Sequence, residues 1–456
     1  MLTLIAAIAV LAVGGFVLAR GRAMAIAASG GARLHSLPAY YGWYGALWSA
    51  LPGLAVIVLW LATAPSLLPS LALAPGVAAP EDPAQRELFW NDVENLARGN
   101  VAAESASDAV RTTANRYVAL RERALAGALA LTLVLGLAGG VFALRAVRPA
   151  LAARVRVERF LRGVLLLSST LAILVTIGIV LSLVFETARF FESVTLREFL
   201  LGTEWSPQIA LRSDQVASSG AFGAVPVFAG TLLITAIAML VAVPIGLLSA
   251  IHMTFYASAR ARDVLKPLLE ILAGVPTVVY GFFAALVVAP AVRSLGAAAG
   301  LSVASESALA AGLVMGIMIV PFVSSLSDDA ITAVPISLRD GSFGLGATRS
   351  ETIRLVIIPA ALPGIVGGFL LAVSRAIGET MIVVMAAGLA ANLTLNPLDA
   401  VTTVTVQIVT LLTGDQEFDS PKTLAAFALG LTLFAVTLAL NVAALRIVKR
   451  YREKYD

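Results

Sequence analysis

The sequence predicts an all-α polytopic membrane protein, and three of its features support this fold class. Hydrophobic residues make up 59% of the 456 residues and charged residues 13%, whereas about 25% of an average soluble domain is charged. Nine apolar runs are long enough to cross the roughly 30 Å hydrocarbon core of a bilayer as helices. Segments of about ten residues with alternating polarity, typical of outer-membrane barrels, do not occur. The runs cover residues 2–19, 43–64, 125–144, 163–185, 229–253, 268–290, 306–325, 363–389 and 424–447.

Two basic stretches beside apolar runs orient the chain. Residues 145–162 hold six Arg and one acidic residue, and residues 446–456 hold five basic and two acidic residues. Nucleic-acid binding is one explanation, but beside spanning helices the preference of Lys and Arg for the cytoplasmic side explains them better. The six runs between the stretches agree, because an even number of crossings returns the chain to the same side. We expect a multi-pass protein of the bacterial inner membrane with an external N-terminus and a cytoplasmic C-terminus.

The runs group into two domains. Residues 1–150 form an N-terminal extension with three runs and an external polar insert at 80–123. Apolar residues at helical spacing in the insert predict a short amphipathic helical hairpin, with a structural or regulatory role. These residues are Leu88, Phe89, Val93 and Leu96.

The second domain, residues 151–456, contains the other six runs. Its longest external connection is the loop 186–228, and its longest cytoplasmic connection is the loop 326–362. Aromatic side chains in the external loop are expected to anchor it at the membrane interface, where such residues are common. They are Phe190, Phe191, Phe199 and Trp205.

The cytoplasmic loop contains a structured polar segment at 340–359. Two capping-box patterns predict two short helices, and three glycines predict a sharp bend between them, because a bend needs unrestricted backbone angles. The capping pairs are Ser337 with Asp340 and Thr348 with Glu351, and the glycines are Gly341, Gly344 and Gly346. Two bent helices form a compact projection that could bind a groove on a soluble partner. The alternative is a solvated connection.

The chain shows no motif for binding a nucleotide or a metal. The phosphate-binding pattern G-x-x-x-x-G-K-[ST] is absent, and none of the four Lys follows a Gly. The lack of Cys excludes disulfides and thiolate metal sites, and the two His, His35 and His252, are far apart in sequence. If transport is uphill, a separate partner must supply the energy, and no cofactor is expected on this chain.

The run 363–389 carries two charged residues near its middle, Arg375 and Glu379. An ionised side chain at the bilayer centre costs at least about 2.5–3.5 kcal/mol, so both should face protein or a water-filled path. Residues four apart on a helix can pair, and the planar guanidinium matches a tetrahedral oxyanion. The two residues form either a translocation-path site, in which Arg375 binds an anion and Glu379 restrains it, or a structural ion pair. Ser374 and Thr380 could add hydroxyl donors, although such hydroxyls more often bond to the backbone.

Two further acidic features lie near the cytoplasmic side. Glu270, near the end of the run 268–290, is interpreted as an interfacial carboxylate. Asp328 and Asp329 open the cytoplasmic loop and are interpreted as helix-end solvation or a partner contact, because a metal site would need further oxygen ligands.

Three segments together carry a resemblance to a known family. Residues 270–282 (EILAGVPTVVYGF), 340–359 and 374–384 (SRAIGETMIVV) closely resemble the C-type permease subunit of phosphate-specific ABC importers. The coupling loop of such permeases reads EAA, three residues, G, nine residues, I-x-L-P. Here Asp340, Gly341 and Ser342 take the EAA positions, Gly346 the glycine, and Val356, Ile358 and Pro359 the last three. The first 150 residues resemble the extension of some long C-type permeases.

The resemblance implies a type I ABC-importer permease core of six transmembrane helices. It also implies a heterodimer with an A-type permease, two copies of a cytoplasmic ATPase that bind ATP and Mg²⁺, and a periplasmic phosphate-binding protein. The ATPases would grip the coupling loops, and Arg375 would line the pathway. The chain itself would not be the hydrolase.

Two other functions are also compatible with the sequence. One is an ABC permease for another oxyanion, such as molybdate or sulfate, since electrostatics alone does not separate these ions. The other is a secondary transporter driven by an ion gradient, with Arg375 and Glu379 as a proton relay.

Overall fold

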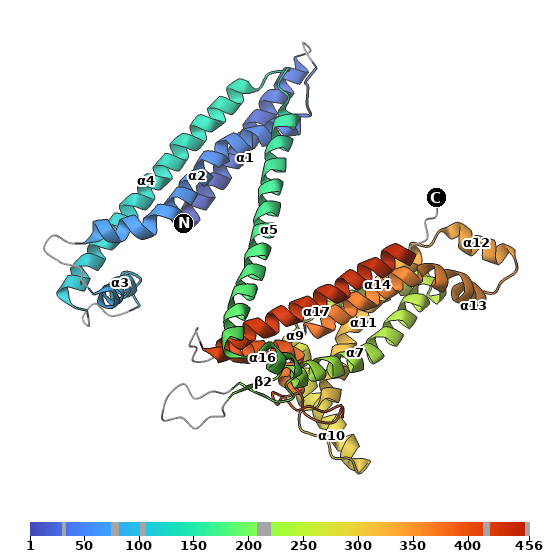
Figure 1. Cartoon of the computed structure of the whole chain (residues 1–456). Helices are drawn as coiled ribbons and strands as arrows, with labels where there is room; N and C mark the ends of the chain where they lie inside the picture. Colours follow the sequence, from blue (N-terminus) through green and yellow to red (C-terminus); the bar gives the residue numbers. More distant parts are fainter. Residues whose placement is uncertain (30–32, 74–81, 101–105, 208–219, 414–419, 452–456) are drawn as a thin grey trace. The chain divides into compact units, whose positions relative to one another are not determined.

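The computed structural model describes residues 1–29, 33–73, 82–100, 106–207, 220–413 and 420–451, and this part of the chain is almost entirely helical (Figure 1). Within it, nine helical segments are long and apolar enough to cross a membrane. The strands of the same part, β1 (Trp205–Ser206) and β2 (Ala221–Phe222), pair in one short antiparallel sheet. The predicted all-α multi-pass membrane fold is therefore confirmed.

The helices follow the chain in this order: α1 (Leu2–Ala28), α2 (Pro38–Ala72), α3 (Pro83–Ala97), α4 (Asp108–Ala146), α5 (Ala153–Ser193), α6 (Leu196–Leu201), α7 (Val225–Ile251), η2 (His252–Tyr256), α8 (Ala259–Ala273), α9 (Thr277–Phe283), η3 (Ala284–Val288), α10 (Ala289–Ala298), α11 (Ala308–Thr332), α12 (Ile336–Gly344), α13 (Arg349–Thr352), η4 (Ile353–Ile357), α14 (Ile358–Ile377), α15 (Met381–Ala386), α16 (Val404–Leu411) and α17 (Pro421–Tyr451). The segments η2, η3 and η4 are π-helical turns that continue α7, α9 and α13.

Contacts within the chain divide it into two compact units, Met1–Ile173 and Leu174–Asp456. The division lies inside α5, whereas residue 150 lies in the connection that precedes this helix.

In the N-terminal unit, α1, α2 and α4 pack closely through small residues. A Cβ at Gly45 would overlap the carbonyl oxygen of Gly15, and a Cβ at Gly139 would overlap that of Trp48. Only glycine lets the helix backbones approach this closely, which is a common way of packing helices in membranes.

The polar insert forms a helical hairpin in the residues that the structure describes, since α3 packs against the beginning of α4. Val93 is fully buried against Val110 and Ala114, with Phe89 and Leu96 partly buried beside them. Leu88 is the exception among the four predicted apolar positions, because it is 64% exposed. Residues 80, 81 and 101–105 of the insert lie outside the described part.

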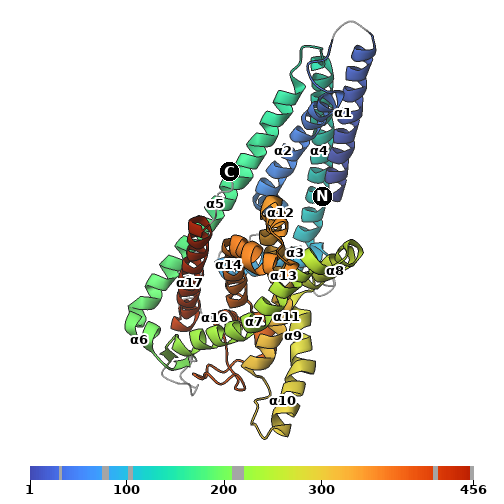
Figure 2. The ribbon, with the colours of Figure 1, turned by 90° about the vertical axis from the view of Figure 1, so that its right-hand side faces the viewer.

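In the C-terminal unit, α7 packs along α11, and α14 packs between α11 and α17 (Figure 2). The core between these helices is made of Ala, Val, Ile and Met side chains such as Ile234, Val314 and Ile319. Gly312 and Gly316 face Ile237 and Val241 of α7 so closely that an added Cβ would be within 2.8 Å of either side chain. Small residues on α11 thus bring it against α7.

Two predicted spans differ from the structure. The run 268–290 is not continuous, because the chain breaks at Gly274–Pro276 and separates the amphipathic α8 from the span Thr277–Ala298. Pro276 has extended backbone angles and lacks an amide hydrogen, so it begins a new helix rather than continuing the old one. The run 363–389 ends early, since α14 stops at Ile377 and its span covers Arg349–Ile377.

Three of the four aromatic residues that were predicted to anchor the loop 186–228 at the membrane interface are buried instead, which corrects that prediction. Phe190, Phe199 and Trp205 are buried in a cluster with Phe222 and Leu429. Trp205 Nε1 also donates a hydrogen bond of 2.9 Å to Gln407 Oε1 on α16. Burial of the rings against one another outweighs their preference for the interface here, and Phe191 is partly buried beside them.

Candidate functional site

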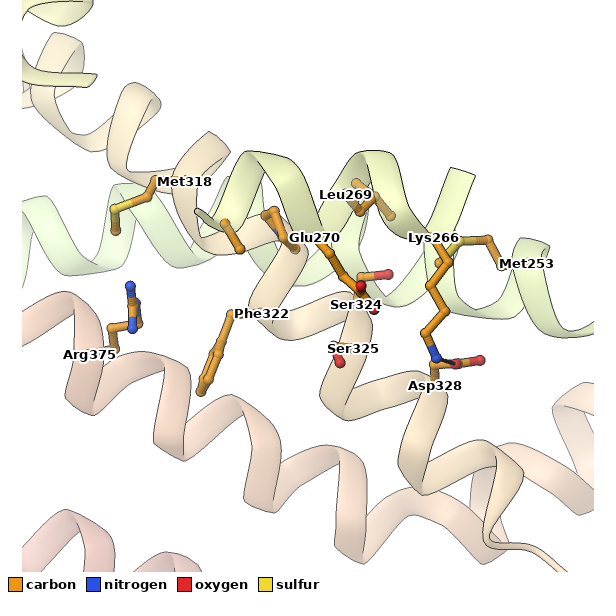
Figure 3. A pocket seen from close by; sticks show the side chains of 12 residues that line it. Met253, Lys266, Leu269, Glu270, Met318, Phe322, Ser324, Ser325, Asp328 and Arg375 are labelled. Carbon is orange, nitrogen blue, oxygen red and sulfur yellow. Dashed lines mark hydrogen bonds and ion pairs between the residues drawn. The ribbon is translucent and has the colours of Figure 1, made fainter. Parts of the chain in front are cut away.

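A cavity of about 300 Å³ lies between η2, α8, α11 and α14 (Figure 3). Its wall combines apolar side chains with positive, negative and hydroxyl groups, and such convergence of a few polar groups in an apolar cavity is typical of ligand sites. The lining residues are Met253, Lys266, Leu269, Glu270, Ala273, Met318, Pro321, Phe322, Ser324, Ser325, Asp328 and Arg375.

Arg375 lies at one end of the cavity, on the last turn of α14. Its guanidinium carbon is 5.7 Å from the centroid of the Phe322 ring, the geometry of a cation–π contact. Among the described residues no carboxylate lies within ion-pair distance of it. Its N–H groups can therefore donate to an anion in the cavity.

The predicted pair between Arg375 and Glu379 is not formed, and this expectation is wrong. Because α14 ends at Ile377, Glu379 does not continue its helical face. Glu379 Oε1 instead accepts hydrogen bonds from the backbone N–H groups of Met381 (3.0 Å) and Ile382 (3.4 Å) at the start of α15. Glu379 therefore caps a helix, which stabilises its negative charge at the helix N-terminus.

The two predicted hydroxyl donors also have local roles. Ser374 donates to Asn441 Oδ1 on α17 at 3.0 Å, and Thr380 precedes α15, its hydroxyl 3.5 Å from the carbonyl oxygen of Gly378. Of the four predicted pathway residues, only Arg375 lines the cavity.

A network of charges at the other end of the cavity centres on Asp328, which is 2% exposed. Lys266 Nζ lies 2.9 Å from Asp328 Oδ2, and Arg262 Nη2 lies 3.1 Å from both carboxylate oxygens. Thr254 Oγ1 of η2 donates to Oδ1 at 2.6 Å. The interpretation of Asp328 as helix-end solvation is therefore wrong. Arg262 and Lys266, four residues apart on α8, share the helix face that meets Asp328.

Glu270 and Ser324 lie between the two ends. In Figure 3 the Glu270 side chain extends from α8 toward α11 at the level of Ser324. Glu270 is exposed on α8, and its interpretation as an interfacial carboxylate did not include a place in the wall of a cavity. Ser324 Oγ is buried without a hydrogen-bond partner in the described part of the chain. An unpaired buried hydroxyl costs free energy, so a ligand that bonds to it gains from the site.

The polar segment forms the bent pair of helices that the sequence predicts. The capping box of Thr348 and Glu351 is present at the start of α13, with Glu351 Oε2 accepting from the Thr348 N–H at 2.8 Å. Gly346 has a φ of +87°, which only glycine adopts readily, so it makes the bend. The predicted box of Ser337 and Asp340 is not formed, because α12 begins two residues earlier than the box requires, with Pro335 in place of Ser337 at its N-cap. Gly341 and Gly344 lie within α12 and do not bend the chain.

The predicted coupling residues occupy three parts of this segment. Asp340, Gly341 and Ser342 lie on α12, and the Ser342 and Thr352 hydroxyls are 2.9 Å apart, which ties α12 to α13. Val356 lies in η4, and Ile358 and Pro359 begin α14. Between the two short helices, Leu345 is 92% exposed at the tip.

Two family models match separate parts of the chain, and both describe transport systems. Residues 5–175 match a model described as phosphate ATP-binding cassette transporter, and residues 242–453 match one described as binding-protein-dependent transport system inner membrane component. The chain is 35% identical over 240 residues to the probable ABC transporter permease protein YqgH of Bacillus subtilis, covering 53% of this chain and 74% of that protein.

Two further relatives carry the phosphate transport name. The phosphate transport system permease protein PstC 1 of Mycobacterium tuberculosis is 32% identical over 278 residues, covering 55% of this chain and 81% of that protein. The PstC protein of Haemophilus influenzae is 32% identical over 275 residues, covering 56% of this chain and 82% of that protein. The chain belongs to the family of membrane permease subunits of phosphate ABC transporters.

Proposed function

We propose that this chain is the membrane subunit of an ATP-driven phosphate importer and that the cavity at Arg375 is part of its translocation path. The observation that carries the proposal is an arginine without an ion-pair partner among the described residues, facing a cavity inside a membrane permease. A guanidinium within a membrane-spanning segment is costly unless it meets protein, water or an anion. Phosphate is a tetrahedral oxyanion that accepts the parallel N–H bonds of Arg.

ATP and Mg²⁺ would bind to a separate cytoplasmic ATPase dimer, which grips the segment from α12 to α13. Leu345 and Phe343 at the tip support this contact, because their apolar side chains are 92% and 41% exposed, respectively. Covering such an apolar surface with a groove on a partner is favourable. A second, A-type permease would complete the path, and a periplasmic phosphate-binding protein would deliver the ion. The N-terminus would lie outside and the C-terminus in the cytoplasm, as the basic stretches predict.

Contacts from the coupling segment reach the cavity. Arg349 Nη1 of α13 donates to the carbonyl oxygen of Phe255 in η2 at 3.2 Å. The neighbouring Thr254 donates to Asp328, which holds Lys266 in the cavity wall. A movement of α13 would therefore act on η2 and through it on the cytoplasmic end of the cavity.

The experiment that tests this function is uptake of labelled phosphate by vesicles containing the complete transporter. We expect uptake to require the ATPase and to continue when a protonophore removes the proton gradient. Uptake that stops with the protonophore and does not need the ATPase would favour a secondary transporter instead. Uptake of labelled molybdate or sulfate with no uptake of phosphate would favour the other oxyanion permeases.

A further inference from the structure

A site for a protonated oxyanion needs a hydrogen-bond acceptor as well as donors. At neutral pH, phosphate keeps at least one P–OH hydrogen, whereas sulfate carries none. An ionised carboxylate is an acceptor only, so it binds a P–OH group and repels an oxyanion that has no hydrogen to donate. Arg375 supplies hydrogen-bond donors in the cavity, so a second group must supply the acceptor.

Two carboxylates line the cavity, Asp328 and Glu270. Asp328 is already satisfied, because it accepts hydrogen bonds from Arg262, Lys266 and Thr254. Glu270 forms no ion pair with any described residue, so its oxygens remain able to accept.

The surroundings of Glu270 also suit an oxyanion. Its side chain extends toward Ser324, and the buried Ser324 hydroxyl lacks a hydrogen-bond partner in the part of the chain that the structure describes (Figure 3). Arg375 lies on α14 on the other side of the same cavity. The wall thus offers a cation, an unpaired hydroxyl and an acceptor from three helices. Glu270 is exposed on α8, so its carboxylate is accessible to an ion that enters the cavity.

We propose that Glu270 accepts the hydrogen of a protonated oxyanion that Arg375 attracts into the same cavity, and that it thereby makes the permease itself select hydrogen phosphate over sulfate. The Ser324 hydroxyl donates to the same ion. This inference rests on the proposed function, because it assigns the substrate's protonation state to a residue of the same cavity. The permease would then select phosphate over sulfate in the membrane, in addition to any selection by a binding protein.

The test measures equilibrium binding of labelled phosphate and labelled sulfate to the purified permease complex without its binding protein. Glu270→Gln keeps the shape of the side chain but removes its negative charge. Asp263→Asn is the matched control, since Asp263 lies on the same helix and is exposed like Glu270, but does not line the cavity. Co-purification of the partner subunits and an unchanged thermal transition show that each variant is folded.

In Glu270→Gln we expect the ratio of phosphate affinity to sulfate affinity to fall about tenfold or more, the effect of one hydrogen bond to a charged group. Asp263→Asn should keep the ratio of the unmodified protein, and Arg375→Ala should lose both ions. An unchanged ratio in Glu270→Gln, or an equal loss of both ions, would overturn the role of Glu270 and leave that of Arg375 intact. Unchanged binding of both ions in Arg375→Ala would instead contradict the proposed pathway.

Discussion

Lys266 Nζ lies 2.9 Å from Asp328 Oδ2, and this contact joins α8 to α11 at the edge of the cavity. The Asp328 side chain is 3% exposed, whereas those of Lys266 and Arg262 are 38% and 34% exposed. Loss of the ion pairs would therefore cost more free energy at Asp328 than at Lys266 or Arg262, because an unpaired buried charge is costly.

Removing both cations should destabilise the protein. Arg262→Ala combined with Lys266→Ala leaves Asp328 buried with only the Thr254 hydroxyl, and breaking a buried ion pair in this way costs about 3–5 kcal/mol. The free energy of unfolding of the purified protein in detergent measures the effect. Asp263→Asn on the same helix should change it by less than about 0.5 kcal/mol. An equal stability of the double variant and the control would show that the network contributes little.

Removing the contact between Arg349 and Phe255 should separate ATP hydrolysis from transport. In Arg349→Ala we expect the ATPase still to bind, while phosphate uptake per ATP hydrolysed decreases, because the hydrogen bond to η2 is lost. Arg354→Ala is a suitable control, since Arg354 is exposed in η4, a few residues further along the chain. Parallel measurement of both rates distinguishes the variants. Equal phosphate uptake per ATP hydrolysed in Arg349→Ala and Arg354→Ala would show that the contact with η2 does not couple ATP hydrolysis to transport.

A side chain at Gly346 should disturb the bend between the two short helices. No atom lies within 4 Å of a Cβ built there, so the cost comes from the backbone angle of φ +87° alone and is about 1–3 kcal/mol. We expect Gly346→Val to reduce co-purification of the ATPase. Gly344→Ala, within α12 and equally free of contacts, should not reduce it. Full ATPase binding by Gly346→Val would contradict the proposal that the segment from α12 to α13 binds the ATPase.

Much of the fold follows from the sequence because the length of an apolar run is a local signal. The capping box at Thr348 and the bend at Gly346 were predicted for the same reason, since each depends on a few adjacent residues. Pairing across helices was harder to predict. Lys266, one of the partners of Asp328, lies 62 residues away on α8, and only the packing of α8 on α11 brings the two together.

The intramembrane pair shows where reading the sequence fails. The spacing of Arg375 and Glu379 suits an ion pair only if one helix contains both residues. The helix ends at Ile377, and backbone N–H groups at the start of α15 take the carboxylate instead. Helix ends are the least certain part of a sequence prediction. Here α14 ends two residues before Glu379, and this separates the carboxylate from Arg375.

The most direct test of the account is phosphate uptake by the complete transporter carrying Arg375→Ala, with Arg293→Ala, an exposed arginine of α10, as the control. We expect the Arg375 variant to lose uptake at least about tenfold, because the ion loses its charged donors, while the ATPase still co-purifies. Arg293→Ala should transport normally. Normal uptake by Arg375→Ala, with the complex intact, would contradict the claim that this guanidinium lines the path of the ion.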